Sequence, residues 1–330
     1  MKDALRLGVR LGVAAMLLVL AFRLAIPSDS RSIAETLSSA WVAESRVAVG
    51  WFAAALVCFG LSFVAVARRF QVLLGAAGLG SSFSPLLRAY VVANFLALVL
   101  PSALLSDVYR VVDARRDTGR SIEVIAVAAA ERVLSLAALG VVVLAAAPFA
   151  PLPPEMNLQL MAALAIAGGL VATSFAFLHP ASNALLRRLA RRLAGVSRAL
   201  AESAESALDA ISALSEKPRT LLSGFGWSIV AQLLPVAAVI CLSRPLDAHI
   251  ADYWYAVIVP LVTLVTLIPV SIGGAGVREW LYVELFGSLG MRAEVALSLS
   301  LSVFAATLVW GFFGLALFAW GRRSQADPSA

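Results

Sequence analysis

Long runs of apolar residues alternate with short polar connections along this chain of 330 residues. Each run is about long enough for a helix to cross a bilayer core of about 30 Å, because a helical residue adds about 1.5 Å. Eight runs stand out: Leu5–Ile26, Val47–Ala67, Pro85–Leu105, Ile122–Phe149, Leu158–Leu178, Leu221–Leu242, Tyr253–Ile272 and Val295–Trp320. The pattern predicts an all-α polytopic membrane protein.

The predicted integral domain covers residues 1–323, in halves of roughly 1–150 and 151–323, and 324–330 are expected to form a disordered tail. The composition is 61% hydrophobic and 14% charged, with a mean hydropathy of +0.91, which excludes a soluble globular domain. The two cysteines and two histidines lack metal-site spacing, so we expect no metal and no cofactor. The net charge of +6 lies in a few short segments and indicates topology and anionic lipid rather than nucleic acid.

Arginine and lysine in the connections predict which side of the membrane each connection faces. They cluster at Lys2/Arg6/Arg10, Arg68/Arg69, Arg110/Arg115/Arg116/Arg120, Arg187/Arg188/Arg191/Arg192/Arg198, Lys217/Arg219 and Arg322/Arg323. Positively charged connections face the cytoplasm. Eight alternating crossings break this rule, because they place the Arg110–Arg120 and Arg187–Arg219 connections outside.

The rule holds throughout if the third and seventh runs enter and leave the membrane on the same side. We therefore predict about six full spans plus two re-entrant hairpins of opposite orientation, which form an inverted repeat near the midplane. Leu104–Val112 and Val277–Phe286 are the candidate return legs. Both termini are then cytoplasmic, and the chain lies in the cytoplasmic (inner) membrane. Eight full crossings with a local exception to the charge rule are the alternative.

A repeated spacing supports the two hairpins. Pro101 and Pro269 each close an apolar run, and Arg110 and Arg278 each follow nine residues after the proline. The second proline precedes three glycines, Gly273, Gly274 and Gly276, and the segment cannot continue an ordinary helix. A broken helix with a buried charge at membrane depth predicts a binding site. The alternative is a surface loop whose Arg278 and Glu279 meet lipid headgroups.

The fourth run carries Glu131 and Arg132 among Ala, Val and Leu. Adjacent helical residues point about 100° apart, so each needs a partner elsewhere in the bundle. The available partners are Asp107, Arg110, Arg278 and Glu279. Ionisable residues at membrane depth are candidates for a functional site. A structural ion pair that holds helices together is the alternative.

The connection over residues 183–219 has leucine, isoleucine and valine at helical spacing and arginines on the other face of its first half. It predicts an amphipathic helix or helical hairpin on the cytoplasmic leaflet. An ordinary solvated connector is the alternative.

Several motifs resemble the lysylphosphatidylglycerol synthase transmembrane-region family over nearly the whole chain. In the first half they are Arg68-Arg69-Phe70-x3-Leu74, Arg88-Ala89-Tyr90, Asn94, Leu100-Pro101, Asp107-x2-Arg110 and Glu131-Arg132. In the second half they are Pro269-x-Ser271-x-Gly273-Gly274-x-Gly276-Val277-Arg278-Glu279, followed by Gly290. The chain departs from the family pattern at Ala103–Ser106, where glycines are usual, at Ser135, where aspartate is common, and in the last span, which has no arginine.

The resemblance implies handling or moving a lipid with a large polar headgroup, which makes membrane lipids with an anionic headgroup or a polyprenyl phosphate the expected partners. A separate lipid-modifying enzyme is a further possible partner. Arg110 and Arg278 would bind the lipid phosphate, because guanidinium pairs with phosphate oxygens in a bidentate manner. Backbone N–H groups at Gly273–Gly276 would bind the same anion. Glu131 and Glu279 would balance the arginines, or bind a cationic headgroup or a proton.

Two other functions remain open. One is a membrane-embedded transferase that acts on polyprenyl-phosphate sugars, although the chain has no Asp-x-Asp motif and no nucleophile in context. The other is a non-catalytic scaffold subunit of a lipid-modifying complex.

Overall fold

The computed structural model describes residues 45–99, 103–150, 157–178, 188, 198–267 and 274–326. Its α-helices are α3 (Ser45–Ala76), α4 (Phe83–Val99), α5 (Ala103–Thr118), α6 (Ser121–Ala146), α7 (Asn157–Leu178), α9 (Arg198–Ser215), α10 (Pro218–Ser243), α11 (Asp252–Thr266), α12 (Val277–Gly287) and α13 (Ala293–Ala326). The short 3₁₀ helices η1 (Ala147–Phe149) and η3 (Arg244–Leu246) follow α6 and α10. The described chain is therefore all-α, as predicted.

Helix length separates the full spans from the shorter elements. Among the described residues, four segments, in α3, α6, α10 and α13, are long and apolar enough to cross a membrane, and each matches a predicted span. At 22 residues α7 fits the fifth predicted run, whereas the first, Leu5–Ile26, lies outside the described residues. The third and seventh runs become α4 and α11, of 17 and 15 residues, which extend for only about 25 Å and 22 Å.

The two short helices each pair with a second helix at the predicted place. Helix α5 follows α4 and contacts it, and α12 follows α11 and contacts it. The predicted return legs Leu104–Val112 and Val277–Phe286 lie within α5 and α12, respectively. The breaking prolines, Pro101 and Pro269, lie in the connections, outside the described residues.

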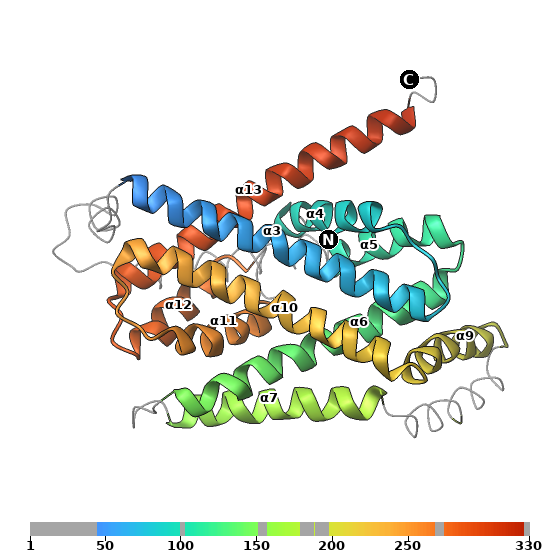
Figure 1. Cartoon of the computed structure of the whole chain (residues 1–330), viewed down its shortest axis with the longest axis horizontal. Helices are drawn as coiled ribbons and strands as arrows, with labels where there is room; N and C mark the ends of the chain where they lie inside the picture. Colours follow the sequence, from blue (N-terminus) through green and yellow to red (C-terminus); the bar gives the residue numbers. More distant parts are fainter. Residues whose placement is uncertain are drawn as a thin grey trace, which may run out of the picture.

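The helix contacts have the symmetry of an inverted repeat. Helices α3 to α6 correspond to α10 to α13: α4 contacts α3, α5 and α13, and α11 contacts α10, α12 and α6. Figure 1 shows α3 and α10 running in opposite directions, with the α4–α5 pair and the α11–α12 pair in opposite halves of the molecule. The repeat thus comprises four helices per unit, and α7 and α9 lie between the units in the sequence.

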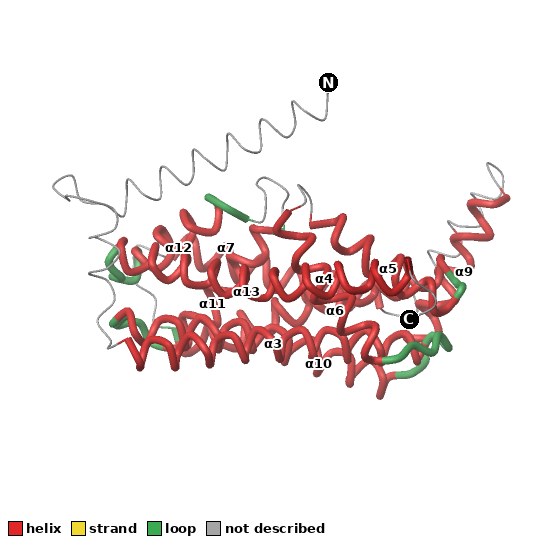
Figure 2. The backbone as a smooth tube through the Cα atoms, turned by 90° about the horizontal axis from the view of Figure 1, so that it is seen from above, coloured by secondary structure: helices red, strands yellow, loops and turns green. Residues whose placement is uncertain are grey.

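Helices α3 and α10 form the main contact between the two repeats. They lie together along one side of the bundle in Figure 2. Each repeat has its own apolar core. One core is built mainly from α10 to α13 around Tyr255, Tyr282 and Phe286, and the other mainly from α3, α4 and α6 around Phe70 and Leu73.

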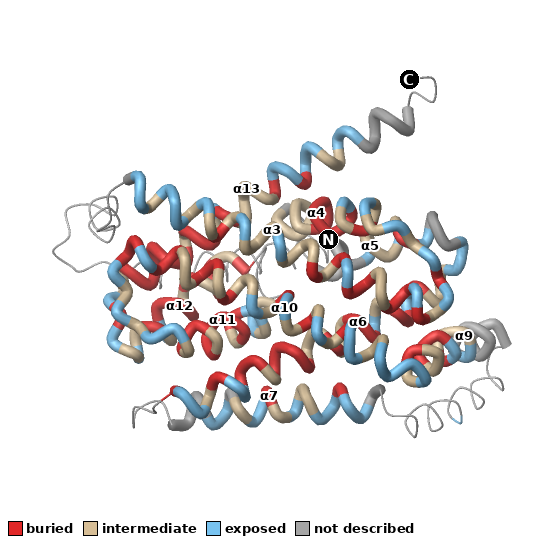
Figure 3. The backbone as a smooth tube through the Cα atoms, in the orientation of Figure 1, coloured by how far each residue is buried: buried red, intermediate tan, exposed pale blue. Residues whose placement is uncertain are grey.

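Apolar side chains also remain on the outside of the bundle. Figure 3 shows exposed positions along α3, α7 and the later part of α13. Among them are Val49, Met161, Phe175, Phe312 and Trp320, each at least 66% exposed. A soluble protein rarely exposes so many large apolar residues, and a bilayer would cover them.

The position of helix α9 differs from the predicted one. Its apolar face was expected on the lipid surface, but Ile211 packs with Ala126 of α6, and Leu214 is fully buried in the core of the first repeat. Lys217, counted among the cations of the cytoplasmic connections, donates a 2.7 Å hydrogen bond to the carbonyl of Ala76 at the end of α3. A cation there satisfies an unpaired helix-end carbonyl, so this part of the 183–219 segment is bound to the bundle.

The ends of the bundle differ in charge. The connections after α3, α5 and α9 lie at one end in Figure 1. Arg120 and Lys217 lie in these connections, and Arg219 is the second residue of α10. We call this the basic end. The chain reaches the opposite end after α6, α10 and α12. Helix α13 returns from there and extends to Ala326, three residues into the predicted tail; residues 327–330 lie outside the described chain.

Candidate functional site

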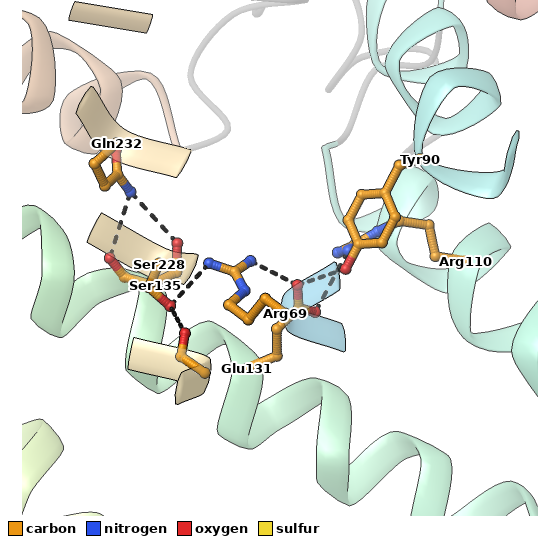
Figure 4. A network of polar contacts seen from close by, with 8 residues as sticks. Arg69, Tyr90, Arg110, Glu131, Ser135, Ser228 and Gln232 are labelled. Carbon is orange, nitrogen blue, oxygen red and sulfur yellow. Dashed lines mark hydrogen bonds and ion pairs between the residues drawn. The ribbon is translucent and has the colours of Figure 1, made fainter. Parts of the chain in front are cut away.

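The Glu131 carboxylate is the centre of a buried polar cluster in the first repeat (Figure 4). Its Oε1 accepts a 2.6 Å bond from Arg69 Nη2 of α3 and a short bond from the hydroxyl of Tyr90 on α4. Its Oε2 lies 3.4 Å from Arg110 Nη1 on α5. Helices α3, α4 and α5 thus each place one side chain against a single carboxylate on α6, whose exposed fraction is 3%.

The pairing of Glu131 with Arg110 confirms that Glu131 has its partners on other helices, as the sequence predicts. Arg69 and Tyr90 were not among the expected partners. Arg69 was predicted to lie in a cytoplasmic connection, and that prediction is wrong, because Arg69 lies within α3 and only 6% of its side chain is exposed. The helical spacing could have predicted this burial, because Arg69 shares the face of α3 that buries Phe70 and Leu73.

Arg69 and Arg110 are held by the carboxylate to different extents. Arg69 makes the shorter contact, 2.6 Å against 3.4 Å, and is the more buried of the two, with 6% of its side chain exposed against 13%. The guanidinium of Arg110 also lies over the ring of Tyr90, 4.3 Å from its centroid. Arg69 is therefore the closer of the two cations that Glu131 contacts.

The polar row continues from Arg69 towards the second repeat. Arg69 Nη1 donates to Ser228 Oγ of α10 at 3.3 Å, and Ser228 donates to the carbonyl of Gly224 in its own helix. One turn further, Gln232 of α10 donates to the backbone carbonyl and hydroxyl oxygens of Ser135 on α6. Figure 4 shows these groups in one row from Arg110 to Gln232. Ser135, where the resemblance noted in the sequence led us to expect an aspartate, is a neutral acceptor at the end of this row.

The second repeat contains a smaller cluster at the start of α12. Arg278 donates to Glu279 Oε1 through Nη2 at 2.6 Å and through Nε at 3.1 Å. Its Nε also lies 3.3 Å from Ser300 Oγ of α13, and its guanidinium lies 5.1 Å from the ring centroid of Phe304. Glu279 therefore pairs with its neighbour Arg278, although both were expected as available partners for Glu131 and Arg132.

Glu279 also caps its own helix. The N–H of Gly276 donates a 2.6 Å bond to Glu279 Oε2, the N3 half of a capping box. Gly274 and Gly276 have φ angles of 75° and 81°, which side chains with a Cβ rarely adopt, so glycine is required at this turn. The glycine N–H groups were predicted to bind an external anion. The N–H of Gly276 instead binds the carboxylate of Glu279 in the same chain, and Gly273 lies outside the described residues.

The two clusters lie at different depths of the bundle. Glu131 is ten residues from the start of α6 at the basic end, which is about 15 Å of helix. Ser300 is seven residues from the start of α13 at the opposite end, or about 11 Å. Each cluster also contains the arginine that follows a breaking proline by nine residues, and an aromatic ring lies beside each of these arginines.

Two further predicted site residues are placed only by their helices. Asp107 lies on α5, three residues before Arg110. Arg132 follows Glu131 on α6 and is partly buried. Their roles in the site stay predictions.

Comparison with known proteins supports the resemblance seen in the motifs. The family described as the lysylphosphatidylglycerol synthase TM region matches residues 7–315. No curated protein and no solved structure matches the chain. Since the family match covers both repeats and both charged clusters, the chain belongs to the lysylphosphatidylglycerol synthase transmembrane-region family.

Proposed function

We propose that this protein moves a phospholipid or a polyprenyl-phosphate-linked lipid between the leaflets of the cytoplasmic membrane, in support of lipid or glycan modification in the cell envelope. Membership of the family connects the chain with lipid-related processes in a membrane. The basic end of the bundle faces the cytoplasm in this proposal, because cationic connections remain on that side.

The observation that carries the proposal is the position of Arg110 beside both a carboxylate and an aromatic ring. Its guanidinium is 3.4 Å from Glu131, is partly exposed, and lies over the Tyr90 ring. A guanidinium in such a position can donate two parallel hydrogen bonds to phosphate oxygens. The close pair of Arg69 and Glu131 persists meanwhile, so no buried carboxylate loses its last cation.

The inverted repeat supports a second contact for the headgroup at Arg278. The two arginines lie on α5 and α12, the corresponding helices of the two repeats. A headgroup that passes between leaflets would meet one arginine from each side. The acyl or polyprenyl chains would stay in the bilayer, against the exposed apolar faces of the long helices.

The test is reconstitution of the protein in liposomes with fluorescent anionic, zwitterionic and polyprenyl-phosphate lipids, scored by the access of a membrane-impermeant reagent to each leaflet. We expect wild type to move at least one phosphate-bearing lipid. Arg110→Gln should slow that movement about tenfold or more, because a charge-assisted contact to the moving phosphate is lost.

The matched control is Arg120→Gln. This arginine is 56% exposed and pairs with Glu123 at the surface of α6, so its loss should leave the rate within about twofold. Wild type that moves none of the lipids, or an Arg110→Gln variant that moves them as fast as wild type, would contradict the proposal.

A further inference from the structure

The donors around Arg278 are already occupied by a carboxylate of the same chain. Glu279 accepts bonds from Gly276 N–H, from Arg278 through Nη2 and Nε, and from Ser300 Oγ at 3.4 Å. A backbone N–H at a helix start, a guanidinium fork and a hydroxyl are also the groups that bind phosphate oxygens. Glu279 and a lipid phosphate therefore compete for the Arg278 guanidinium.

The two clusters differ in how many cations contact the buried carboxylate. Glu131 has two guanidinium partners, of which Arg69 is the closer. Among the described residues, Glu279 is paired with one cation, Arg278. Only 2% of the Glu279 side chain is exposed, so separating this pair leaves a buried carboxylate with hydrogen bonds but no counterion. Opening the Arg278 site is correspondingly harder than releasing Arg110.

We propose that Glu279 is an autoinhibitory contact that closes the Arg278 site to anionic headgroups. This inference rests on the proposed function, in which Arg278 binds the lipid phosphate. In the closed arrangement the carboxylate holds the guanidinium against Phe304. In the open arrangement the guanidinium turns to the phosphate, and Glu279 keeps its bonds to Gly276 N–H and to Ser300. Because separating Arg278 from Glu279 costs free energy, Arg278 stays paired until a headgroup binds.

The decisive variant is Glu279→Gln. Glutamine still accepts the Gly276 N–H, since either residue completes a capping box, so the start of α12 is preserved. The charge that competes with phosphate is removed. We expect Glu279→Gln to bind phosphatidylglycerol about tenfold more tightly than wild type, because Arg278 no longer has to leave a charged partner.

Binding is measured with the full-length protein in phosphatidylcholine nanodiscs that contain increasing fractions of brominated phosphatidylglycerol. Bromine quenches nearby tryptophan fluorescence, and Trp280 follows the pair directly in the sequence. Subtracting the signal of the same protein with Trp280→Phe isolates this position. Glu284→Gln is the control, because Glu284 is exposed on the same helix and should leave the affinity unchanged.

The outcomes separate this inference from the proposed function. If Arg278→Gln weakens binding and Glu279→Gln fails to strengthen it, the autoinhibitory contact is wrong and the phosphate site stands. If Arg278→Gln binds as wild type does, both are wrong at this site. Should Glu279→Gln not fold, Phe304→Leu replaces it: loss of the ring that holds the guanidinium in the closed arrangement should strengthen binding about twofold, and an unchanged or weaker affinity overturns the inference.

Discussion

Arg69→Met is expected to lower the free energy of unfolding by about 3–5 kcal/mol, because it removes the closest partner of a buried carboxylate. Glu131 would keep the Tyr90 hydroxyl and the more distant Arg110. Methionine fills much of the space of the arginine stem, so the loss comes mainly from the weaker compensation of the buried carboxylate charge. Chemical unfolding in detergent, followed by circular dichroism, measures the change.

Two further variants test the cause of this loss. Arg68→Met changes the adjacent arginine, which is exposed and bonds Gln71, and should cost less than about 1 kcal/mol. Combining Arg69→Met with Glu131→Leu removes both buried charges and should recover much of the stability, because replacing a buried ion pair by apolar residues is often neutral. If Arg69→Met is as stable as Arg68→Met, the ion pair does not hold the first repeat together.

Gly314→Ala is expected to cost about 1–3 kcal/mol by forcing α13 away from α4. An alanine Cβ at this position would overlap the carbonyl oxygen of Val91 and crowd Phe95 Cβ at 2.9 Å, and the backbone of α4 cannot move independently. Small residues permit this close approach of helices within a membrane. Thermal unfolding and limited proteolysis of the variant in detergent measure the effect.

Gly169→Ala is the matched control for Gly314→Ala. Gly169 lies within α7, and a Cβ there meets nothing within 4 Å. Alanine favours helix over glycine by about 1 kcal/mol, so this variant should be as stable as wild type or more so. Equal stability of the two variants would show that α4 and α13 tolerate a larger separation than the structure indicates.

The polar bonds beside Gly314 explain why the α4–α13 contact matters for the proposed site. Arg88 of α4 donates to the carbonyl of Leu317, and Asn94 donates to that of Thr307, so bonds on both sides of Gly314 hold α4 against α13. Tyr90 lies on α4 between these donors and supplies the ring beneath Arg110. A displaced α4 would therefore shift the aromatic support of the proposed phosphate-binding arginine.

The sequence alone determined the helical spans, the two breaks and the candidate arginines. Apolar run length predicts helices in a membrane because unpaired backbone groups are costly in hydrocarbon. Positively charged connections all face the cytoplasm only if the third and seventh runs enter and leave the membrane on the same side. This predicted that both runs are interrupted, and the structure contains a second helix after each. The equal spacing from Pro101 to Arg110 and from Pro269 to Arg278 indicated the repeat.

Only the tertiary structure decided which charges meet. Glu131 could pair with several distant residues. The packing of α3 against α6 brings Arg69 to it, although the charge pattern had placed Arg69 in a cytoplasmic connection. Arg278 and Glu279 pair despite being neighbours, because the capping turn at Gly276 draws the carboxylate back towards the helix start, within reach of the long arginine side chain. Hydropathy and charge counts record what each segment contains and on which side it lies. The partner of a buried charge depends on which helix faces are brought together, and that is a property of the packed bundle.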